Sequence, residues 1–406
     1  MRPSRFSILI LVFAMGIAAL VAGFNMAVDP YLFFGMPRKP GFNQVKPAVD
    51  THERLMKAYD APRKLARTVI LGSSRTDIGL APQHAVWSSQ YRPVYNLSLA
   101  GSGLRSGLLY LRHLVAARPV AEAPRTVVVG LDFEAFLYKP PAPGVAHPVA
   151  VRGEVEQRLL VQDDGSANPE RAVRRLKDFG AAALSLDAIA DSVATIAANR
   201  LAGGTDMAPD GHFSEAGFRD TTAADGVAAL FAQKNAATTT QFSTPHQVLS
   251  DVAGGPIREL QTVRDLLAFA KQHHITVMLA IQPAHASRLN LLTQMGYWPD
   301  YERWKRGLTL LVDAERSAGT EVTLWDFGGY EQYAREPIPA DGDRKTRLAW
   351  FWDPVHYTSA LGDLMTGRML ATPGLPDFGV VLTPANLEQR LLQVRENQKL
   401  AAPAGT

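Results

Sequence analysis

The sequence contains no cysteine, which excludes a disulfide framework, a zinc–thiolate site and a cysteine nucleophile. It also lacks a strong charge of either sign, because the formal net charge is only +3 and the basic residues are scattered singly. This pattern argues against nucleic acid as a partner. No group of His, Asp and Glu residues has a spacing typical of a metal site, and no cofactor is expected.

The composition is that of a folded protein. Of the 406 residues, 47% are hydrophobic and 20% are charged. A chain of this length is able to bury one large core or two ordinary ones.

One long hydrophobic run lies at the N-terminus. No charge occurs between Arg5 and Asp29, a length sufficient for a helix that crosses a bilayer. Arg2 and Arg5 precede the run, which favours a cytoplasmic tail (1–5), a transmembrane anchor (6–28) and a translocated remainder. Basic residues also follow the run and weaken this inference: Arg38, Lys39 and Lys46.

Two other interpretations of the run stay open. The first is a cleaved signal peptide, although the run is longer than the usual apolar region of about 7–15 residues. Small residues at Ala22 and Gly23 would form the cleavage site. The second is the core helix of a soluble cytoplasmic hydrolase, against which the length of the run argues.

The body of the chain alternates strand and helix patterns. Near-continuous apolar runs predict strands at 67–74, 93–99, 125–133, 275–281 and 321–327. Amphipathic patterns predict helices at 53–66, 104–119, 256–274 and 298–319. Buried strands that alternate with such helices are typical of an α/β domain with an open, doubly wound parallel sheet.

The domain organisation follows from this alternation. Residues 29–66 are predicted to be a linker and a first helix, 67–382 the α/β domain, and 383–406 a C-terminal helix and tail. Within the domain, 134–255 is far longer than an ordinary crossover. We predict that it is an inserted helical subdomain, with two or three helices, or a lid over the carboxyl ends of the strands.

A serine, Ser74, stands at the end of the first predicted strand in the block Gly-Ser-Ser-Arg. Ligands of open parallel sheets bind at the carboxyl ends of the strands, so this hydroxyl is a candidate nucleophile. The same residues are also those of an ordinary polar turn.

A carboxylate and a histidine, Asp353 and His356, stand near the other end of the chain. Their spacing allows the carboxylate to hold one tautomer of the imidazole, whose other nitrogen is then free to accept a proton from a serine. A pair that only stabilises a loop is the alternative.

Together these blocks resemble the SGNH, or GDSL-like, hydrolase superfamily. The resemblance implies a three-layer α/β/α fold with Ser74 as nucleophile and Asp353 and His356 as its partners. It implies that Gly101, which follows Asn96 after the second strand, helps to bind the oxyanion, and that Asn96 belongs to the same oxyanion- and substrate-binding region. The blocks occur in the family's order across about residues 67–370.

One position departs from the family. The third block normally provides an asparagine whose amide donates to the oxyanion, and this chain has Asp132 there. An ionised carboxylate cannot donate a hydrogen bond, so either Asp132 is protonated, or Arg75 completes the hole, or Asp132 has another role. His285 follows a predicted strand and is a further, weaker candidate for the same cleft.

The arrangement of anchor, Gly-Ser-Ser block and late Asp-x-x-His resembles envelope proteins that act in the O-acetylation of alginate and the D-alanylation of teichoic acid. This implies a serine esterase or O-acyltransferase in the bacterial inner membrane, with its catalytic domain in the periplasm. The implied partners are an acylated polysaccharide or small ester and a membrane-bound acyltransferase. The alternative is an inactive glycan-binding or scaffold protein.

Overall fold

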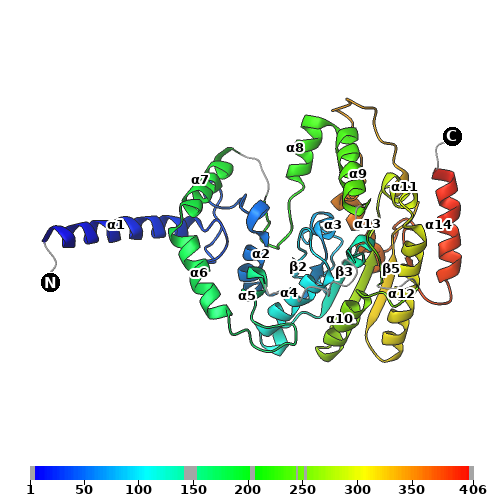
Figure 1. The fold of residues 1–406 in the computed structure, drawn as a ribbon, viewed down its shortest axis with the longest axis horizontal. Helices are drawn as coiled ribbons and strands as arrows, with labels where there is room; N and C mark the ends of the chain where they lie inside the picture. The colour runs from blue at the N-terminus through cyan, green and yellow to red at the C-terminus, as the bar shows by residue number, and fades with distance from the viewer. Residues whose placement is uncertain (1–4, 141–152, 202–205, 244–245, 251–253, 402–406) are drawn as a thin grey trace.

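The computed structural model describes residues 5–140, 153–201, 206–243, 246–250 and 254–401. Its centre is a six-stranded sheet in the order β2-β1-β3-β4-β5-β6, with helices packed on both faces (Figure 1). In chain order the strands are β1 (Thr68–Leu71), β2 (Val94–Asn96), β3 (Thr126–Leu131), β4 (Thr276–Ile281), β5 (Val322–Asp326) and β6 (Val380–Val381).

The described helices surround this sheet. The α-helices are α1 (Arg5–Val28), α2 (Val49–Asp60), α3 (Ser74–Gly79), α4 (Leu104–Ala116), α5 (Glu154–Gln157), α6 (Arg171–Leu184), α7 (Leu186–Leu201), α8 (Ala216–Asp225), α9 (Val227–Ser243), α10 (Leu260–Gln272), α11 (Ala286–Gln294), α12 (Trp298–Ser317), α13 (Ser359–Met369) and α14 (Leu387–Ala401). Short 3-10 helices are η1 (Ala61–Arg63), η2 (Val120–Glu122), η3 (Phe133–Phe136) and η4 (Tyr333–Arg335).

The sheet is mostly parallel. Strands β1 to β5 are parallel, as predicted, whereas β6 pairs antiparallel with β5 at one edge. The sequence did not predict β6, because a run of two valines is too short to show a period. An entirely parallel sheet was therefore the wrong prediction for this edge.

Alternate residues of the central strands enter two hydrophobic clusters on opposite faces of the sheet. Val127 and Val129 of β3 pack in the larger cluster with side chains of α4, α10 and α12. Val128 packs in the second cluster with side chains of α13. Because such strands are buried on both faces, they appear in the sequence as continuous apolar runs.

Two predicted helices differ at their ends. The helix predicted at 53–66 is α2, which begins at Val49 and gives way to η1, where Pro62 lies in the first turn. The helix predicted at 256–274 is α10, which begins only at Leu260, so Pro256 lies before it. In both cases the hydrophobic period located the helix but not its first residue.

The long insertion supplies two separate parts of the structure. Its described residues contain five α-helices, α5 to α9, where two or three were predicted. Helices α6 and α7 pack against α1, whereas α8 and α9 lie on the far side of α2 from them (Figure 1). Only the second pair contributes side chains to the cleft described below.

The segment predicted as a linker is folded tightly around the end of α1. The Asp29 carboxylate accepts hydrogen bonds from the backbone N–H groups of Phe34 (3.1 Å) and Met36 (3.0 Å). The buried Lys46 ammonium donates to the carbonyl oxygens of Val28 (2.9 Å) and Asp29 (2.7 Å). Burial is the main cause that lowers the pKa of Lys46 to about 8. The chain therefore leaves α1 through a fixed turn.

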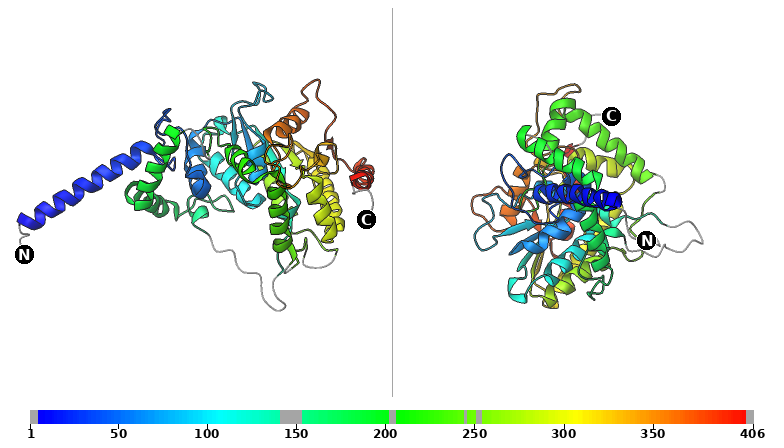
Figure 2. Two further views of the ribbon diagram at one scale, coloured as in Figure 1. Left: turned by 90° about the horizontal axis from the view of Figure 1, so that it is seen from above. Right: turned by 90° about the vertical axis from the view of Figure 1, so that its left-hand side faces the viewer.

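Helix α1 projects from the body of the protein (Figure 2). Among the described residues it is the one helix that is, by itself, long and apolar enough to cross a membrane. Large apolar side chains are exposed along it from Phe6 to Leu20. Its last turn is different, because Asn25 and Val28 are buried against the domain.

Helices α3 and α13 approach each other closely because each has a glycine at the contact. A Cβ at Gly79 would overlap the ring of Tyr357, and a Cβ at Gly362 would overlap the carbonyl oxygen of Gly79. Helix α3 begins at Ser74 and α13 begins three residues after His356, so this contact sets the distance between the two.

We predict that Gly362→Ala lowers the free energy of unfolding by about 2 kcal/mol, because a backbone oxygen cannot move aside as a side chain can. Urea denaturation measures the change. The matched control is Gly180→Ala in α6, where no atom lies within 4 Å of the added Cβ. The control is expected to be neutral or slightly stabilising, and equal stability of the two variants would contradict the prediction.

Candidate active site

The nucleophile candidate lies where β1 turns into α3. Ser73 is the N-cap of α3, and its hydroxyl accepts a hydrogen bond from the Arg75 backbone N–H at 3.3 Å. Ser74 is thus the first residue of the helix. Gly72 precedes them, and a Cβ there would overlap the side chain of Thr76. The small residues of this block allow the tight strand-to-helix turn that presents Ser74.

Ser74, His356 and Asp353 form a continuous chain of hydrogen bonds. The Ser74 Oγ lies 2.8 Å from Nε2 of His356, and Nδ1 of His356 lies 2.6 Å from Oδ2 of Asp353. The other oxygen of Asp353 accepts from the backbone N–H groups of Val355 (2.7 Å) and His356 (2.8 Å). The carboxylate therefore makes Nδ1 the donor and leaves Nε2 to accept the serine proton.

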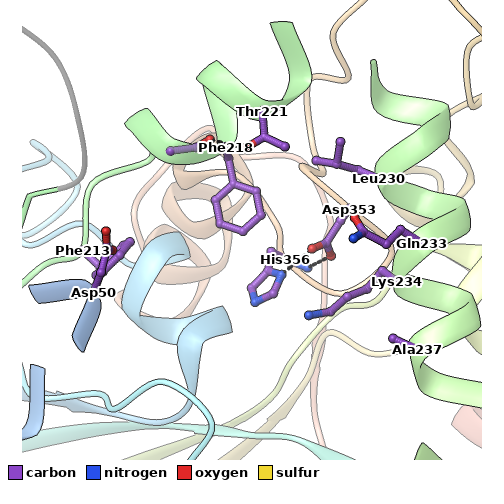
Figure 3. A pocket seen from close by; sticks show the side chains of 11 residues that line it. Asp50, Phe213, Phe218, Thr221, Leu230, Gln233, Lys234, Ala237, Asp353 and His356 are labelled. Carbon is purple, nitrogen blue, oxygen red and sulfur yellow. Dashed lines mark hydrogen bonds and ion pairs between the residues drawn. The ribbon is translucent and has the colours of Figure 1, made fainter. Parts of the chain in front are cut away.

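The charge of Asp353 is maintained by its neighbours. Burial acts to raise its pKa, but His356 outweighs this through its charge and its hydrogen bonds and holds the pKa at about 2. The carboxylate is therefore ionised at any pH well above 2. Figure 3 shows Asp353 and His356 side by side, beneath α8 and next to α9.

These three residues open on a cleft with two adjoining parts. The polar part has a volume of about 360 Å³ and is lined by residues that include Ser74, Gly101, Asp132, Arg288 and His356. The apolar part has a volume of about 550 Å³, and its lining includes Phe213, Phe218, Leu230 and His356. Lys234 lines both parts, and its ammonium points towards His356 (Figure 3).

Gly101 lines the polar part of the cleft. Its φ is +63°, a conformation that favours glycine, and no atom lies within 4 Å of the position of a Cβ. Within the described residues, neither the N–H of Gly101 nor that of Ser74 is donated to another group. Two backbone N–H groups of residues that line the polar part of the cleft are therefore unoccupied.

Asn96 does not line the cleft. It is fully buried, its amide donates to the carbonyl oxygens of Thr76 (3.1 Å), Asp77 (3.2 Å) and Leu80 (3.0 Å), and its Oδ1 accepts from the Ser98 N–H. It joins α3 to the segment after β2. This position does not fit the substrate-binding role expected for Asn96.

His285 is also outside the cleft. It is buried at the start of α11, where its ring caps the Ser287 N–H and its Nε2 lies 2.8 Å from the carbonyl oxygen of Glu336. Burial lowers its pKa, which favours the neutral ring. Its backbone N–H donates to Pro354, so His285 supports the turn between Asp353 and His356.

Asp132 is held by three donors rather than left free. Its carboxylate lies 2.7 Å from the Arg75 guanidinium, accepts from the Gln282 amide at 2.7 Å and accepts from the Ser73 hydroxyl at 2.5 Å. Burial would lower the pKa of Arg75, but Asp132 and then Glu134 outweigh it and raise that pKa. The positive charge of Arg75 thus compensates the carboxylate beside the cleft.

Helix α2 holds the loop that carries Gly101 in place, a contact that the sequence did not predict. Glu53 accepts from the Ala100 N–H at 2.9 Å, and Arg54 donates to the Ala100 carbonyl oxygen at 2.8 Å. The buried Lys57 ammonium donates to the Ser98 carbonyl oxygen at 2.5 Å. The three side chains recur at the spacing of one helical face, but that pattern alone did not show what they bind.

Arg288 and Glu134 are two further cleft residues that the sequence did not indicate. The Arg288 guanidinium bonds Oε1 of Glu134 through Nε (3.0 Å) and Nη2 (2.9 Å). No group of three or more His, Asp and Glu side chains in the described ranges is arranged to hold a metal ion.

We predict that Asp132→Asn lowers the free energy of unfolding by about 3 kcal/mol, because it leaves the buried Arg75 with only Glu134, at 3.9 Å, as an ionic partner. The control is Asp163→Asn, which removes an exposed ion pair with Arg105. It is expected to lower the free energy of unfolding by less than about 1 kcal/mol. Urea denaturation of both variants gives the comparison. An Asp132 variant as stable as the control would show that Arg75 does not need this carboxylate.

No protein-family model matches the chain, no curated protein matches it, and no solved structure matches it. The case for a site at Ser74 therefore rests on the hydrogen bonds, burial and charges of the chain itself.

Proposed function

We propose that this protein is an SGNH-type serine esterase or O-acyltransferase, tethered to the bacterial inner membrane by α1 with its catalytic domain in the periplasm. The observation that carries the proposal is the hydrogen-bonded chain from Ser74 through His356 to an ionised Asp353, at the edge of an open cleft. A serine hydroxyl is a weak nucleophile until a base removes its proton, and this geometry supplies both the base and its orienting group.

The reaction follows from the positions of these atoms. The Ser74 Oγ attacks the carbonyl carbon of an ester, and its proton passes to Nε2 of His356. The intermediate collapses when His356 returns that proton to the leaving alkoxide, which releases an alcohol and leaves an acyl group on Ser74. Water or a sugar hydroxyl then attacks the acyl group, again with His356 as base, and Ser74 is restored.

The oxyanion of each intermediate needs hydrogen-bond donors. The free N–H groups of Ser74 and Gly101 are suited to this role. Asp132 cannot donate, but its pairing with Arg75 reduces the cost of a carboxylate near a developing negative charge. We infer that Asp132 has a structural role, to hold Arg75 and Ser73 in place.

The substrate class is inferred from the cleft and the anchor. The two adjoining parts of the cleft suit an ester donor and a separate acceptor, and Lys234 lines both of them. An enzyme anchored by α1 would act beside a membrane-bound acyl donor or a polymer-export complex. We therefore propose an acylated envelope or exported polysaccharide as substrate, with acetyl as the acyl group and a membrane-bound acyltransferase as partner.

A second candidate is a catalytically inactive SGNH-like protein that binds glycan or serves as a scaffold. The observation that favours it is Asp132, which stands where the resemblance implies an amide donor. Loss of one such donor costs on the order of 100- to 1000-fold in rate in a serine hydrolase.

We predict that Ser74→Ala lowers the release of acetate from an aryl acetate by about 1000-fold or more, because the nucleophile is lost. The control is Ser89→Ala, an exposed serine outside the cleft, which is expected to retain full activity. A fluorophosphonate probe is expected to label the native protein at Ser74 and not the Ser74→Ala variant. A folded native protein that neither hydrolyses the ester nor reacts with the probe would favour the glycan-binding candidate.

We predict that Glu53→Ala lowers kcat by about 10- to 100-fold with little change in KM, because the Ala100 N–H loses its acceptor and the loop that carries Gly101 shifts. The control is Thr51→Ala, an exposed residue of the same helix, which is expected to leave kcat unchanged. Steady-state kinetics with the aryl acetate separate kcat from KM. An unaltered kcat in a folded Glu53 variant would show that α2 does not position Gly101.

A further inference from the structure

Helices α6 and α7 expose large apolar side chains on their outward faces. The exposed fractions run from 43% for Phe179 to 82% for Leu186, and the residues are Val173, Leu176, Phe179, Leu184, Leu186, Val193 and Leu201. On α7 the exposed positions Leu186, Ala190, Val193, Ala197 and Leu201 recur at helical spacing and form one continuous apolar stripe. Isolated exposed leucines are ordinary, but a stripe of this length marks a binding surface.

The inward faces of the same helices are small or polar. Helix α7 buries Ala188, Ser192 and Thr195, and α6 buries Asp178, Ala182 and Ala183. Asp178 is bonded by Arg158 and Arg174. Except for Phe179, whose ring packs against Phe33 and Phe34, the large apolar side chains thus point away from the domain, the reverse of the pattern of a helix that covers a core.

Both helices are fixed to the last turn of α1. The Asn25 amide donates to the Ala183 carbonyl oxygen at 3.0 Å, and the Ser192 hydroxyl donates to the Asn25 amide oxygen at 2.9 Å. Tyr31, just after α1, donates to Asp191 of α7 at 2.6 Å. Figure 1 shows α6 and α7 at the base of α1, running across its axis.

The length of α1 indicates where these contacts lie relative to a membrane that α1 crosses. The hydrocarbon core of a bilayer, about 30 Å thick, takes about 20 helical residues. Because α1 has 24 residues and begins at Arg5, a span that starts at its first turn ends close to Asn25. The residues of α6 and α7 that hold Asn25 would therefore lie at the level of the lipid headgroups.

Two basic side chains of α6 also suit a position at the lipid headgroups. Arg175 and Lys177 are exposed and flank the apolar positions of its outward face. Basic side chains beside an apolar stripe are typical of helices that lie in the interface of a membrane, where they reach the headgroups. Helices α6 and α7 together are apolar enough for one span, but they meet at a bend of 59° and bury Asp178 between them and the domain, which does not suit a crossing.

We propose that α6 and α7 form a membrane-binding surface that lies in the headgroup region of the bilayer crossed by α1. The inference rests on α1 being a membrane anchor, as proposed above. The outward stripe enters the boundary between headgroups and acyl chains, and Arg175 and Lys177 contact anionic headgroups. The domain is then held to the membrane at two places and in one orientation.

Because the sequence contains no cysteine, a single introduced cysteine gives one unique labelling site. The full chain is reconstituted in vesicles of phosphatidylcholine and phosphatidylglycerol, and a fluorescent NBD group is attached at Leu176→Cys or Val193→Cys. The matched control is Leu310→Cys, a leucine of α12 that is 61% exposed and remote from these helices. Circular dichroism verifies that each variant is folded.

The expected result is that iodide in the water quenches the labels at 176 and 193 at least about threefold less than the label at 310, whereas lipids with a shallow nitroxide quench them more. Labels at 176 and 193 as accessible to iodide as the control would overturn the proposal. A label at Phe13→Cys in α1 distinguishes the proposed membrane-binding surface of α6 and α7 from the proposed membrane anchor. Deep lipid quenching at 13 with aqueous labels at 176 and 193 rejects the surface but retains the anchor, and an aqueous label at 13 rejects both.

Discussion

The arrangement of the site depends on the contacts of one buried group, the ammonium of Lys57. It contacts Asp77 of α3 at 2.9 Å, Glu53 at 3.0 Å and the Ser98 carbonyl oxygen, so it joins the helix that begins at Ser74 to the loop that carries Gly101. Burial acts to lower the pKa of Lys57, but Asp77 and Glu53 outweigh it and raise that pKa. Burial also raises the pKa of Asp77, and the nearby charge of Glu53 acts in the same direction, whereas Lys57 acts to lower it.

One long insertion in the chain, and not the local sequence around Ser74 and His356, completes this arrangement. Ser74 and His356 stand far apart in sequence and meet because α3 and α13 touch through two glycines, Gly79 and Gly362. The wall opposite them comes from α8 and α9, which belong to the segment between β3 and β4. The same segment supplies α6 and α7, so this one insertion forms both the far wall of the cleft and the helices against which α1 packs.

The sequence predicts the parts whose signal is local. Strands β1, β3 and β4 are near-continuous apolar runs because both faces of the sheet are covered there. The Asp-x-x-His spacing of Asp353 and His356 is sufficient to suggest their hydrogen bond. It does not predict long-range pairings. The residues around Asp132 in the sequence do not indicate that its carboxylate contacts Arg75, Gln282 and Ser73. Likewise, the residues around Glu53 do not indicate that it accepts a hydrogen bond from a loop residue 47 positions away. Asn96 and His285 have side chains that suit a site, but burial and satisfied hydrogen bonds give them structural roles instead.

The turn at Asp29 and Lys46 has a consequence for how far the protein reaches. A flexible stalk would let the domain sample a volume above its anchor, whereas this chain leaves α1 through a fixed, buried turn. If α1 crosses a membrane and the protein is an enzyme, both as proposed, the cleft is confined to one height above the membrane, and the protein reaches its substrate by diffusing in two dimensions with its anchor. A polymer emerging from a neighbouring export pore would have to pass that height to be modified, so the rigidity of the turn would select substrates by where they leave the membrane.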